Sequence, residues 1–279
     1  MTGAHRIPWL NRADAPGELG RHVNHDPRSR AFAHAPSAKP LRTKVWPRHY
    51  APLDQGPVGS CTGNAMLGAI YTGRCYDALP TELRAKYRPT EDVARDVLYS
   101  SATKLDAFTG TYPPVDTGSD GVSVSKAAQR LRLISGYRHT FSLDDALSTL
   151  AHDSHVIVGV NWYRAFDMPD SHGMVTLSSG GMPEGGHEFL VYGIDVDRER
   201  VLARNSWGER WGGDWVSGTS FRSVGPGEFQ FSFTDFVRLL REDGDVTVPV
   251  PLSQPKPRPA GEHAETWLEK LRDWLQSHL

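Results

Sequence analysis

Apolar residues in the first half of the chain recur at helical spacing. Residues 61–76, CTGNAMLGAIYTGRCY, carry apolar side chains on every side, which is typical of a helix buried on all faces. Residues 90–107 and 123–134 place apolar residues three and four positions apart, and the second run starts with a serine that could cap a helix. Residues 142–151 predict a further short helix, also with a serine at its start.

The pattern changes to short apolar runs after about residue 150. These runs are bounded by Gly, Asp and Pro, which indicates strands joined by turns. A helical part over about 55–140 and a strand-rich part over about 150–240 predict an α+β fold, with two packed subdomains and a cleft between them. The expected strands are residues 155–162, 187–196, 200–206 and 227–233.

The two ends of the chain differ from its centre. Residues 1–45 are rich in Arg, His, Pro and Ala without sustained periodicity, which predicts an extended arm. Residues 246–260 predict a Pro-rich linker, and residues 261–279 an amphipathic helix. This helix could pack on its own domain or dock to another protein, and its mixed charges do not favour a membrane.

The composition of the chain bears on its binding partners and on the cellular compartment in which it folds. The chain has 279 residues, a net charge of −2 and 38% hydrophobic residues, so no overall charge favours nucleic acid or an anionic membrane. Two cysteines cannot form a disulfide scaffold, which favours a reducing compartment. The N-terminal residues lack the apolar core of a signal peptide. We therefore expect a protein made in a cytoplasm, with later release by lysis or assembly into a virion left open.

One of the two cysteines lies in DQGPVGSCTGNA, residues 54–65, where a helix is expected to begin. A helix N-terminus lowers a thiol pKa below its free value of about 8.5, so Cys61 is a candidate nucleophile. Gly56 and Gly59 allow a tight turn before it, and Gln55 could donate to an oxyanion together with the Cys61 N–H. Taken alone, the stretch favours a small buried cysteine over a nucleophile.

A histidine and an asparagine follow at the ends of predicted strands. His187 comes after two glycines, the second being Gly186, that would let a substrate backbone approach. Asn205 could accept a hydrogen bond from the imidazole, and Trp207 could shield that bond from water. The other histidines lack partner ligands at metal spacing, so we expect no metal and no cofactor.

Three blocks, DQGPVGSC, GGHEFLVYGID and RNSWGERWG, resemble in order the signature blocks of papain-like cysteine peptidases. His187 and Asn205 follow Cys61 by 126 and 144 residues, close to the spacing of about 130–150 found in that family. The resemblance covers about residues 46–240 and implies a papain-like peptidase domain over 46–245, with a helical subdomain and a β-barrel-like one. It implies Cys61 as nucleophile, His187 as acid and base, Asn205 as its orienter and Gln55 in the oxyanion hole.

The resemblance also implies a substrate cleft lined by the segment that holds Gly118 and Gly121, and by Gly186, Glu188 and Trp207. The residue after the family's histidine borders the S2 pocket, so Glu188 there would favour a basic P2 side chain. The alternative is a Glu188 that faces solvent or pairs with an arginine.

Departures from the family pattern are also present. Gly59 stands where the family usually has a cysteine, and Thr62 where it has a tryptophan, a combination closer to bacterial and viral members. The arm lacks the long helical propeptide of secreted relatives, although it could still cover the cleft.

The function expected is an endopeptidase for protein or peptide substrates. The alternatives are a structural or docking component of a virion or complex, and an acyl transferase.

Overall fold

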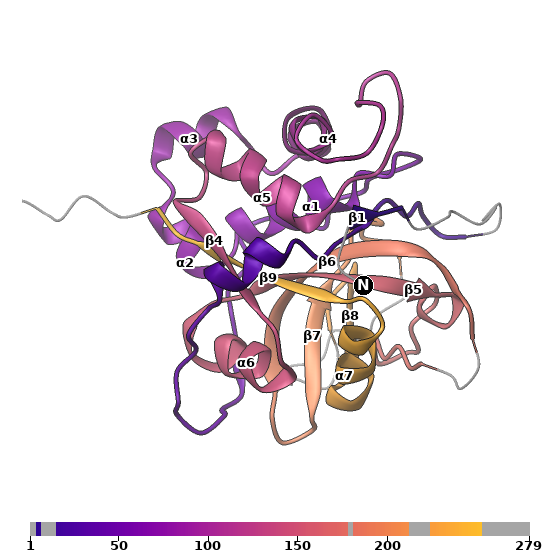
Figure 1. Ribbon diagram of the computed structural model, residues 1–279. Helices are drawn as coiled ribbons and strands as arrows, with labels where there is room; N and C mark the ends of the chain where they lie inside the picture. The colour runs from indigo at the N-terminus through magenta and orange to yellow at the C-terminus, as the bar shows by residue number, and fades with distance from the viewer. Residues whose placement is uncertain (1–3, 7–14, 178–180, 212–223, 253–279) are drawn as a thin grey trace, which may run out of the picture.

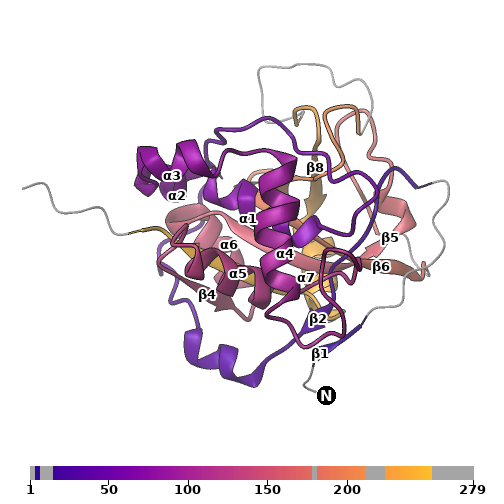
Figure 2. The same ribbon diagram turned by 90° about the horizontal axis from the view of Figure 1, so that it is seen from above.

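The computed structural model describes residues 4–6, 15–177, 181–211 and 224–252 (Figure 1). Helices gather in one half and an antiparallel sheet in the other, as the sequence predicts. The helical half contains α1 (Cys61–Ile70), α2 (Gly73–Ala78), α3 (Thr81–Lys86), the π-helical segment η2 (Val93–Tyr99), α4 (Ser100–Thr103) and α5 (Gly121–Arg130). Figure 2 shows α1, α4 and α5 lying in front of the sheet when the molecule is viewed from above.

The larger sheet has seven strands in the order β4-β9-β5-β6-β7-β8, with β3 paired to β6 as well. The end strands β4 and β8 do not pair with each other, so the sheet is open and the expected barrel-like form holds only loosely. The strands are β3 (Lys44–Val45), β4 (Gly136–Thr140), β5 (Val156–Tyr163), β6 (Pro183–Asp195), β7 (Arg200–Arg204), β8 (Glu228–Ser232) and β9 (Asp245–Val250). The helices α6 (Leu143–Ser148), η3 (Thr149–Asp153), η4 (Arg164–Phe166) and α7 (Phe233–Arg241) connect them.

Strand β6 belongs to two hydrophobic cores at once. Successive side chains of a strand point to opposite faces. Phe189 and Val191 therefore join the core beneath the sheet, whereas Leu190 and Tyr192 join the core formed with α1 and α5. The same alternation separates His187 from Glu188 at the start of the strand. The fold thus consists of two halves that share β6.

The arm is part of the folded structure. Residues 15–25 run across the molecule, and β2 (Val23–Asn24) pairs with β1 (Ala4–His5) before the short helix η1 (Pro27–Phe32). Leu19 is 2% exposed and belongs to the core beneath the sheet. The arm therefore contributes a buried side chain to this core.

Several sequence-based boundaries were wrong. The helix predicted over 61–76 ends at Ile70, and α2 begins separately at Gly73, whose φ of 48° favours glycine. Asp120 caps α5 by accepting from Ser123 N, so the serine is the donor and not the cap. Ser142 does cap α6, as predicted.

The predicted boundary between the domain and the C-terminal linker, at residues 245 and 246, was also wrong. Residues 246–250 do not begin a linker but form most of β9, which pairs with both β4 and β5. The helix α7 was not predicted. The remainder of the expected linker beyond residue 252 and the expected helix over 261–279 lie outside the described residues. Within the part of the chain that is described, no helix has the length and apolar character needed to cross a membrane.

The core between α5 and the sheet generates a stability prediction. Val124 on α5 is fully buried, whereas Val115 in the preceding loop is 52% exposed. We expect Val124→Ala to lower the free energy of unfolding by about 2 kcal/mol, because it removes buried methyl groups and leaves a cavity. The same change at Val115 should cost less than about 0.5 kcal/mol. Urea denaturation measures both, and equal losses would contradict the packing described here.

Candidate active site

Cys61 is the first residue of α1 and is fully buried. A network of hydrogen bonds fixes the loop that leads into this helix. Gly59 N donates to Asp116 Oδ2 at 2.7 Å, and Asp116 also accepts from the Tyr99 hydroxyl. Helix α1 packs against β6, so the sulfur lies beside the strand that carries His187 and Glu188.

His187 and Asn205 form the polar pair that the sequence predicted. His187 Nε2 lies 2.7 Å from Asn205 Oδ1, and both residues are buried. Ser206 N also donates to this oxygen at 2.8 Å, which fixes Oδ1 as the acceptor and Nε2 as the donor. The indole rings of Trp162 and Trp207 lie 4.7 and 4.9 Å from the imidazole centroid. Exclusion of water by these rings strengthens the bond.

Gln55 is held with its amide nitrogen facing the cleft. Its Oε1 accepts from Ser206 Oγ at 2.6 Å, which directs Nε2 the other way. Nε2 donates to the carbonyl of Val58 at 2.8 Å and to that of Glu18, on the arm, at 3.2 Å. Trp207 Nε1 donates to the same Glu18 carbonyl at 3.2 Å. Two side chains predicted to line the site therefore bind one peptide oxygen of the arm.

Beyond Glu18 the arm crosses Cys61 in extended form. The amides of Gly20 and Arg21 both donate to Gly186 O, at 3.0 and 2.9 Å. On the opposite side, Ser119 N donates to Gly20 O at 2.9 Å, and His22 N donates to Ser119 O at 2.7 Å. The arm thus bridges the two halves with backbone hydrogen bonds of the kind that hold an extended peptide.

The glycines at this crossing are needed for close approach. A Cβ at Gly20 would lie 1.9 Å from Gly59 O, and one at Gly118 would lie 2.5 Å from Gly20 O. Gly118 also has a φ of 68°, which disfavours a side chain. A larger residue at either position would push the arm out of the cleft.

The surroundings of Cys61 raise the pKa of its thiol. Burial raises the pKa of the Cys61 thiol well above its usual range, and the nearby charge of Glu188 raises it further. Backbone N–H groups of Glu188, Thr62 and Gly20 act in the opposite direction but do not compensate. The lowered pKa expected at a helix N-terminus is therefore not found at the buried Cys61.

Arg21, on the arm, enters a pocket of acidic residues near Cys61. Its side chain is fully buried, and Nη2 bonds to Asp245 Oδ2 and, at 2.7 Å, to Asp243 O. Glu188 is fully buried, and its pKa is raised well above the usual range by burial and by Asp245, partly offset by Arg21. Full burial shows that Glu188 does not face solvent, and it lies near Arg21 without a hydrogen bond between them, so its expected contact with a P2 side chain stays a prediction.

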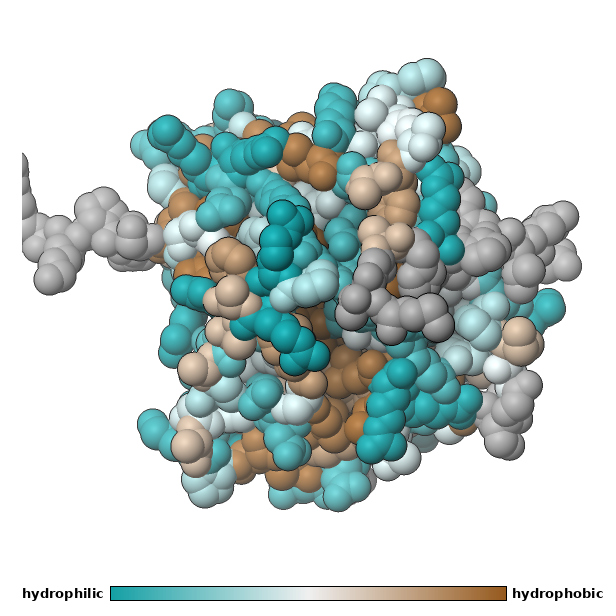
Figure 3. All heavy atoms as spheres, viewed as in Figure 1, coloured by the Kyte–Doolittle hydropathy of each residue, from teal (hydrophilic) through white to brown (hydrophobic). Residues whose placement is uncertain are grey.

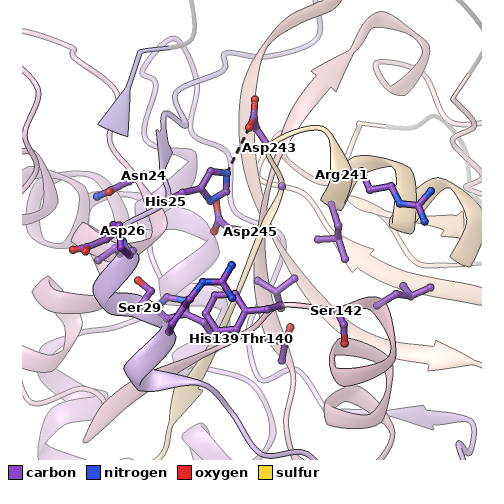
Figure 4. Close-up of a pocket in the computed structure, with 18 of the residues that line it drawn as sticks. Asn24, His25, Asp26, Ser29, His139, Thr140, Ser142, Arg241, Asp243 and Asp245 are labelled. Carbon is purple, nitrogen blue, oxygen red and sulfur yellow. Dashed lines mark ion pairs between the residues drawn. The ribbon is translucent and has the colours of Figure 1, made fainter. Parts of the chain in front are cut away.

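A cavity of about 590 Å³ opens beyond Asp245, between the arm, β4 and α7 (Figure 4). Its rim carries the ion pair between His25 and Asp243, 3.7 Å apart. Its apolar side chains form a brown hollow on the face seen in Figure 3; they are Val122, Phe141, Leu143, Val237, Leu240 and Val246. The cavity continues the Arg21 pocket outward, because Asp245 lines both.

The structure brings together the residues singled out from the sequence. Around the arm lie Cys61, Gln55, His187, Asn205, Gly118, Gly121, Gly186, Glu188 and Trp207. Sequence reasoning missed Arg21, Ser119, Asp116, Trp162 and Asp245. No local pattern marks these five residues, since each acts through a partner distant in the chain.

The covered thiol generates a reactivity prediction. Both cysteines are buried, at 0% and 2% exposure for Cys61 and Cys75. We expect iodoacetamide to label neither at an appreciable rate at pH 7 in the native chain. Arg21→Ala removes the buried anchor of the arm and should accelerate labelling of Cys61 at least about tenfold. Cys75 is the internal control and should stay protected; labelling of Cys61 in the native chain at the rate of a free thiol would contradict the covered site.

Comparison with known proteins agrees with the architecture. No family model and no curated protein sequence matches the chain. Among solved structures, xylellain, a cysteine protease from Xylella fastidiosa, is similar with a TM-score of 0.57 and 21% identity over 86% of this chain and 98% of that one. Digestive procathepsin L 3 from Tenebrio molitor larval midgut is similar with a TM-score of 0.51 and 15% identity, over 78% and 73%. The chain therefore has the fold of papain-like cysteine proteases.

Proposed function

We propose that the protein is a cysteine endopeptidase that acts through Cys61, His187 and Asn205. The observation that carries the proposal is the buried bond between His187 Nε2 and Asn205 Oδ1, at the strand end against which the Cys61 helix packs. This arrangement is what a thiol nucleophile needs from an oriented imidazole. The similar solved structures are those of cysteine proteases, which supports the same reaction class.

The proposed reaction has two steps. The Cys61 thiolate attacks the peptide carbonyl carbon, and the oxyanion accepts from Gln55 Nε2 and from the Cys61 N–H. His187, whose Nε2 is engaged by Asn205, uses Nδ1 to protonate the leaving amine as the C–N bond breaks. Water then attacks the thioester with His187 as the base, releasing the acid and restoring the thiol. No metal or organic cofactor is needed for these steps.

The covered cleft is, in this proposal, an inhibited state of the enzyme. The Glu18 carbonyl occupies the donors of Gln55 and Trp207, and Gly20 lies over the sulfur. A substrate carbonyl would need the same donors, so substrate and arm compete. Activity would follow displacement or removal of residues 15–25.

Two alternative functions, a docking component and an acyl transferase, would depend on different features of the chain. A docking component would rely on the arm, residues 1–45, and on the expected helix over 261–279, which lies outside the described residues. An acyl transferase would use the same thioester but pass it to an amine. Hydrolysis in water without added amine would favour the peptidase over the transferase.

An assay with the full chain tests the proposal. Arg21→Ala should cleave a mixture of quenched fluorogenic peptides faster than the native chain does, because its arm is released more easily. Adding Cys61→Ala should abolish this activity, and His187→Ala should lower it by about 10³-fold or more. Asn205→Ala should lower it less, about 10–100-fold, because the imidazole keeps its chemistry but loses its orientation.

Cys75→Ala is the matched control, since Cys75 is buried in α2 away from the cleft. It should leave cleavage by the Arg21→Ala chain unchanged. Cleavage that persists after Cys61→Ala would refute the assignment of the nucleophile. A chain that labels rapidly at Cys61 yet cleaves no peptide would refute the peptidase function.

A further inference from the structure

Asp116 connects the loop before Cys61 to the segment on the opposite side of the cleft. One of its carboxylate oxygens, Oδ2, accepts from Gly59 N at 2.7 Å, and the other, Oδ1, accepts from the Tyr99 hydroxyl. The Tyr99 oxygen in turn accepts from Gly118 N at 2.9 Å. A chain of hydrogen bonds therefore runs from the amide two residues before Cys61 to the glycine that the arm approaches most closely on that side.

The phenol of Tyr99, at the centre of this chain of bonds, is held by helix packing. Tyr99 is fully buried and ends the π-helical segment η2, against which α1 packs. Gly63 in α1 permits the contact, because a Cβ there would lie 2.3 Å from Ala94 O and 2.9 Å from Tyr99 Cβ. Burial and the neighbouring carboxylate of Asp116 raise the pKa of the Tyr99 hydroxyl, so it keeps its proton and donates it to Asp116.

The loop that Asp116 holds joins the two groups proposed to donate to the oxyanion. Gln55 begins this loop, and Cys61 ends it as the first residue of α1. Inside the loop, Gln55 Nε2 donates to Val58 O at 2.8 Å, which ties the loop to itself. The bond from Gly59 N to Asp116 ties the loop to a different segment. The spacing between Gln55 Nε2 and the Cys61 N–H therefore depends on where Asp116 holds the middle of the loop.

This restraint gains importance when the arm is displaced. In the closed structure Gly20 of the arm packs on the loop, since a Cβ at Gly20 would lie 1.9 Å from Gly59 O. With the arm displaced, this packing would be lost, whereas the bond from Gly59 N to Asp116 would still hold the loop. Donors stabilise an oxyanion only if they are already in position, and a displacement of about 1 Å can lower a rate about 10²-fold.

We propose that Asp116 is a positioning residue for the oxyanion site, and that it acts by holding Gly59 and hence the Cys61 N–H. The inference deepens the proposed peptidase function and rests on it. A carboxylate suits this role because its two oxygens accept from an N–H and from a hydroxyl at the same time. Its charge also makes the bond to the N–H stronger than a bond to a neutral acceptor.

Substitution of Asp116 in the Arg21→Ala chain tests the proposal. Asp116→Ala should lower kcat for peptide cleavage by about 10–100-fold, because the two oxyanion donors lose their spacing. Labelling of Cys61 by iodoacetamide should fall by less than about threefold, because alkylation of the sulfur forms no oxyanion. Equal losses in cleavage and labelling would indicate a merely structural role and would overturn the proposal.

Asp116→Asn is the conservative variant. Its amide oxygen can still accept from Gly59 N, while its NH₂ group can donate to the Tyr99 oxygen. It should keep kcat within about fivefold of the Arg21→Ala chain, because only the charge of the acceptor is lost. A loss as large as that of Asp116→Ala would contradict the role of the hydrogen bond to Gly59. If Asp116→Ala does not fold, Tyr99→Phe serves in its place, and an unchanged kcat in that variant would overturn the proposal.

Asp153→Ala is the matched control. Asp153 lies in η3 and, like Asp116, accepts from a backbone amide of another segment, that of Ser37 at 3.1 Å. Its substitution removes a comparable hydrogen bond outside the loop of residues 55–61. This variant should leave both kcat and the labelling of Cys61 unchanged. A loss of kcat as large as that of Asp116→Ala would remove the special role of Asp116.

Binding of a peptide aldehyde separates this proposal from the peptidase function. The Cys61 sulfur adds to the aldehyde carbon of acetyl-Leu-Leu-Arg aldehyde, and the thiol proton passes to the carbonyl oxygen. That oxygen occupies the oxyanion site although no peptide bond is cleaved, and the adduct protects Cys61 from iodoacetamide. In Asp116→Ala the aldehyde concentration that gives half protection should rise at least about tenfold, and Asp116→Asn should restore it.

The outcomes of this measurement are distinct. An unchanged half-protecting concentration in Asp116→Ala, or no protection in any of the chains, would overturn the role of Asp116. A raised concentration in chains that cleave no peptide would refute the peptidase function and leave Asp116 as the positioning residue of the oxyanion site.

Discussion

Strand β6 is the constraint on which the rest of the structure depends. Its side chains must alternate between two cores because a strand has a period of two. His187 therefore falls on the face of Phe189, beside the tryptophans that exclude water, and Glu188 falls on the face of Leu190, beside α1 and α5. A shift of one residue in the pairing of β6 would exchange the imidazole and the carboxylate.

The two faces of β6 meet the same extended segment of the arm. Backbone groups of Gly186 and Ser119 hold the arm from both halves of the molecule, and one buried cation anchors its side chain. An uncompensated buried charge is expensive, so Arg21 and its acidic pocket stabilise each other. Removing either partner alone leaves charge without a counterion, so the arm is a structural element of the closed site.

The closed arm also reverses the electrostatics expected of a reactive cysteine. A helix N-terminus favours a thiolate, but exclusion of water disfavours it more strongly at Cys61. Reactivity in this molecule is thus coupled to solvent access. In the proposed open state, water would reach the sulfur, and the backbone N–H groups that fail to compensate for burial in the closed state would act on an ionised thiol.

The sequence by itself determined the two halves of the fold and the four central strands, because helical and strand periodicity are local. The resemblance of three short blocks predicted Cys61, Gln55, His187 and Asn205, and the structure brings these residues together. Local patterns cannot show which segments pair with one another over long distances in the chain, and only the tertiary structure decided this. Strand β9 has a proline-containing sequence typical of a linker, and pairing with two neighbours makes it a strand.

The pairing of Arg21 with Asp245 joins residues more than two hundred positions apart. Each is an ordinary charged residue in its own segment, and only the cleft gives the two a common environment. The sequence could therefore suggest that Glu188 borders a pocket for a basic side chain, but not that the chain carries such a side chain in its own arm.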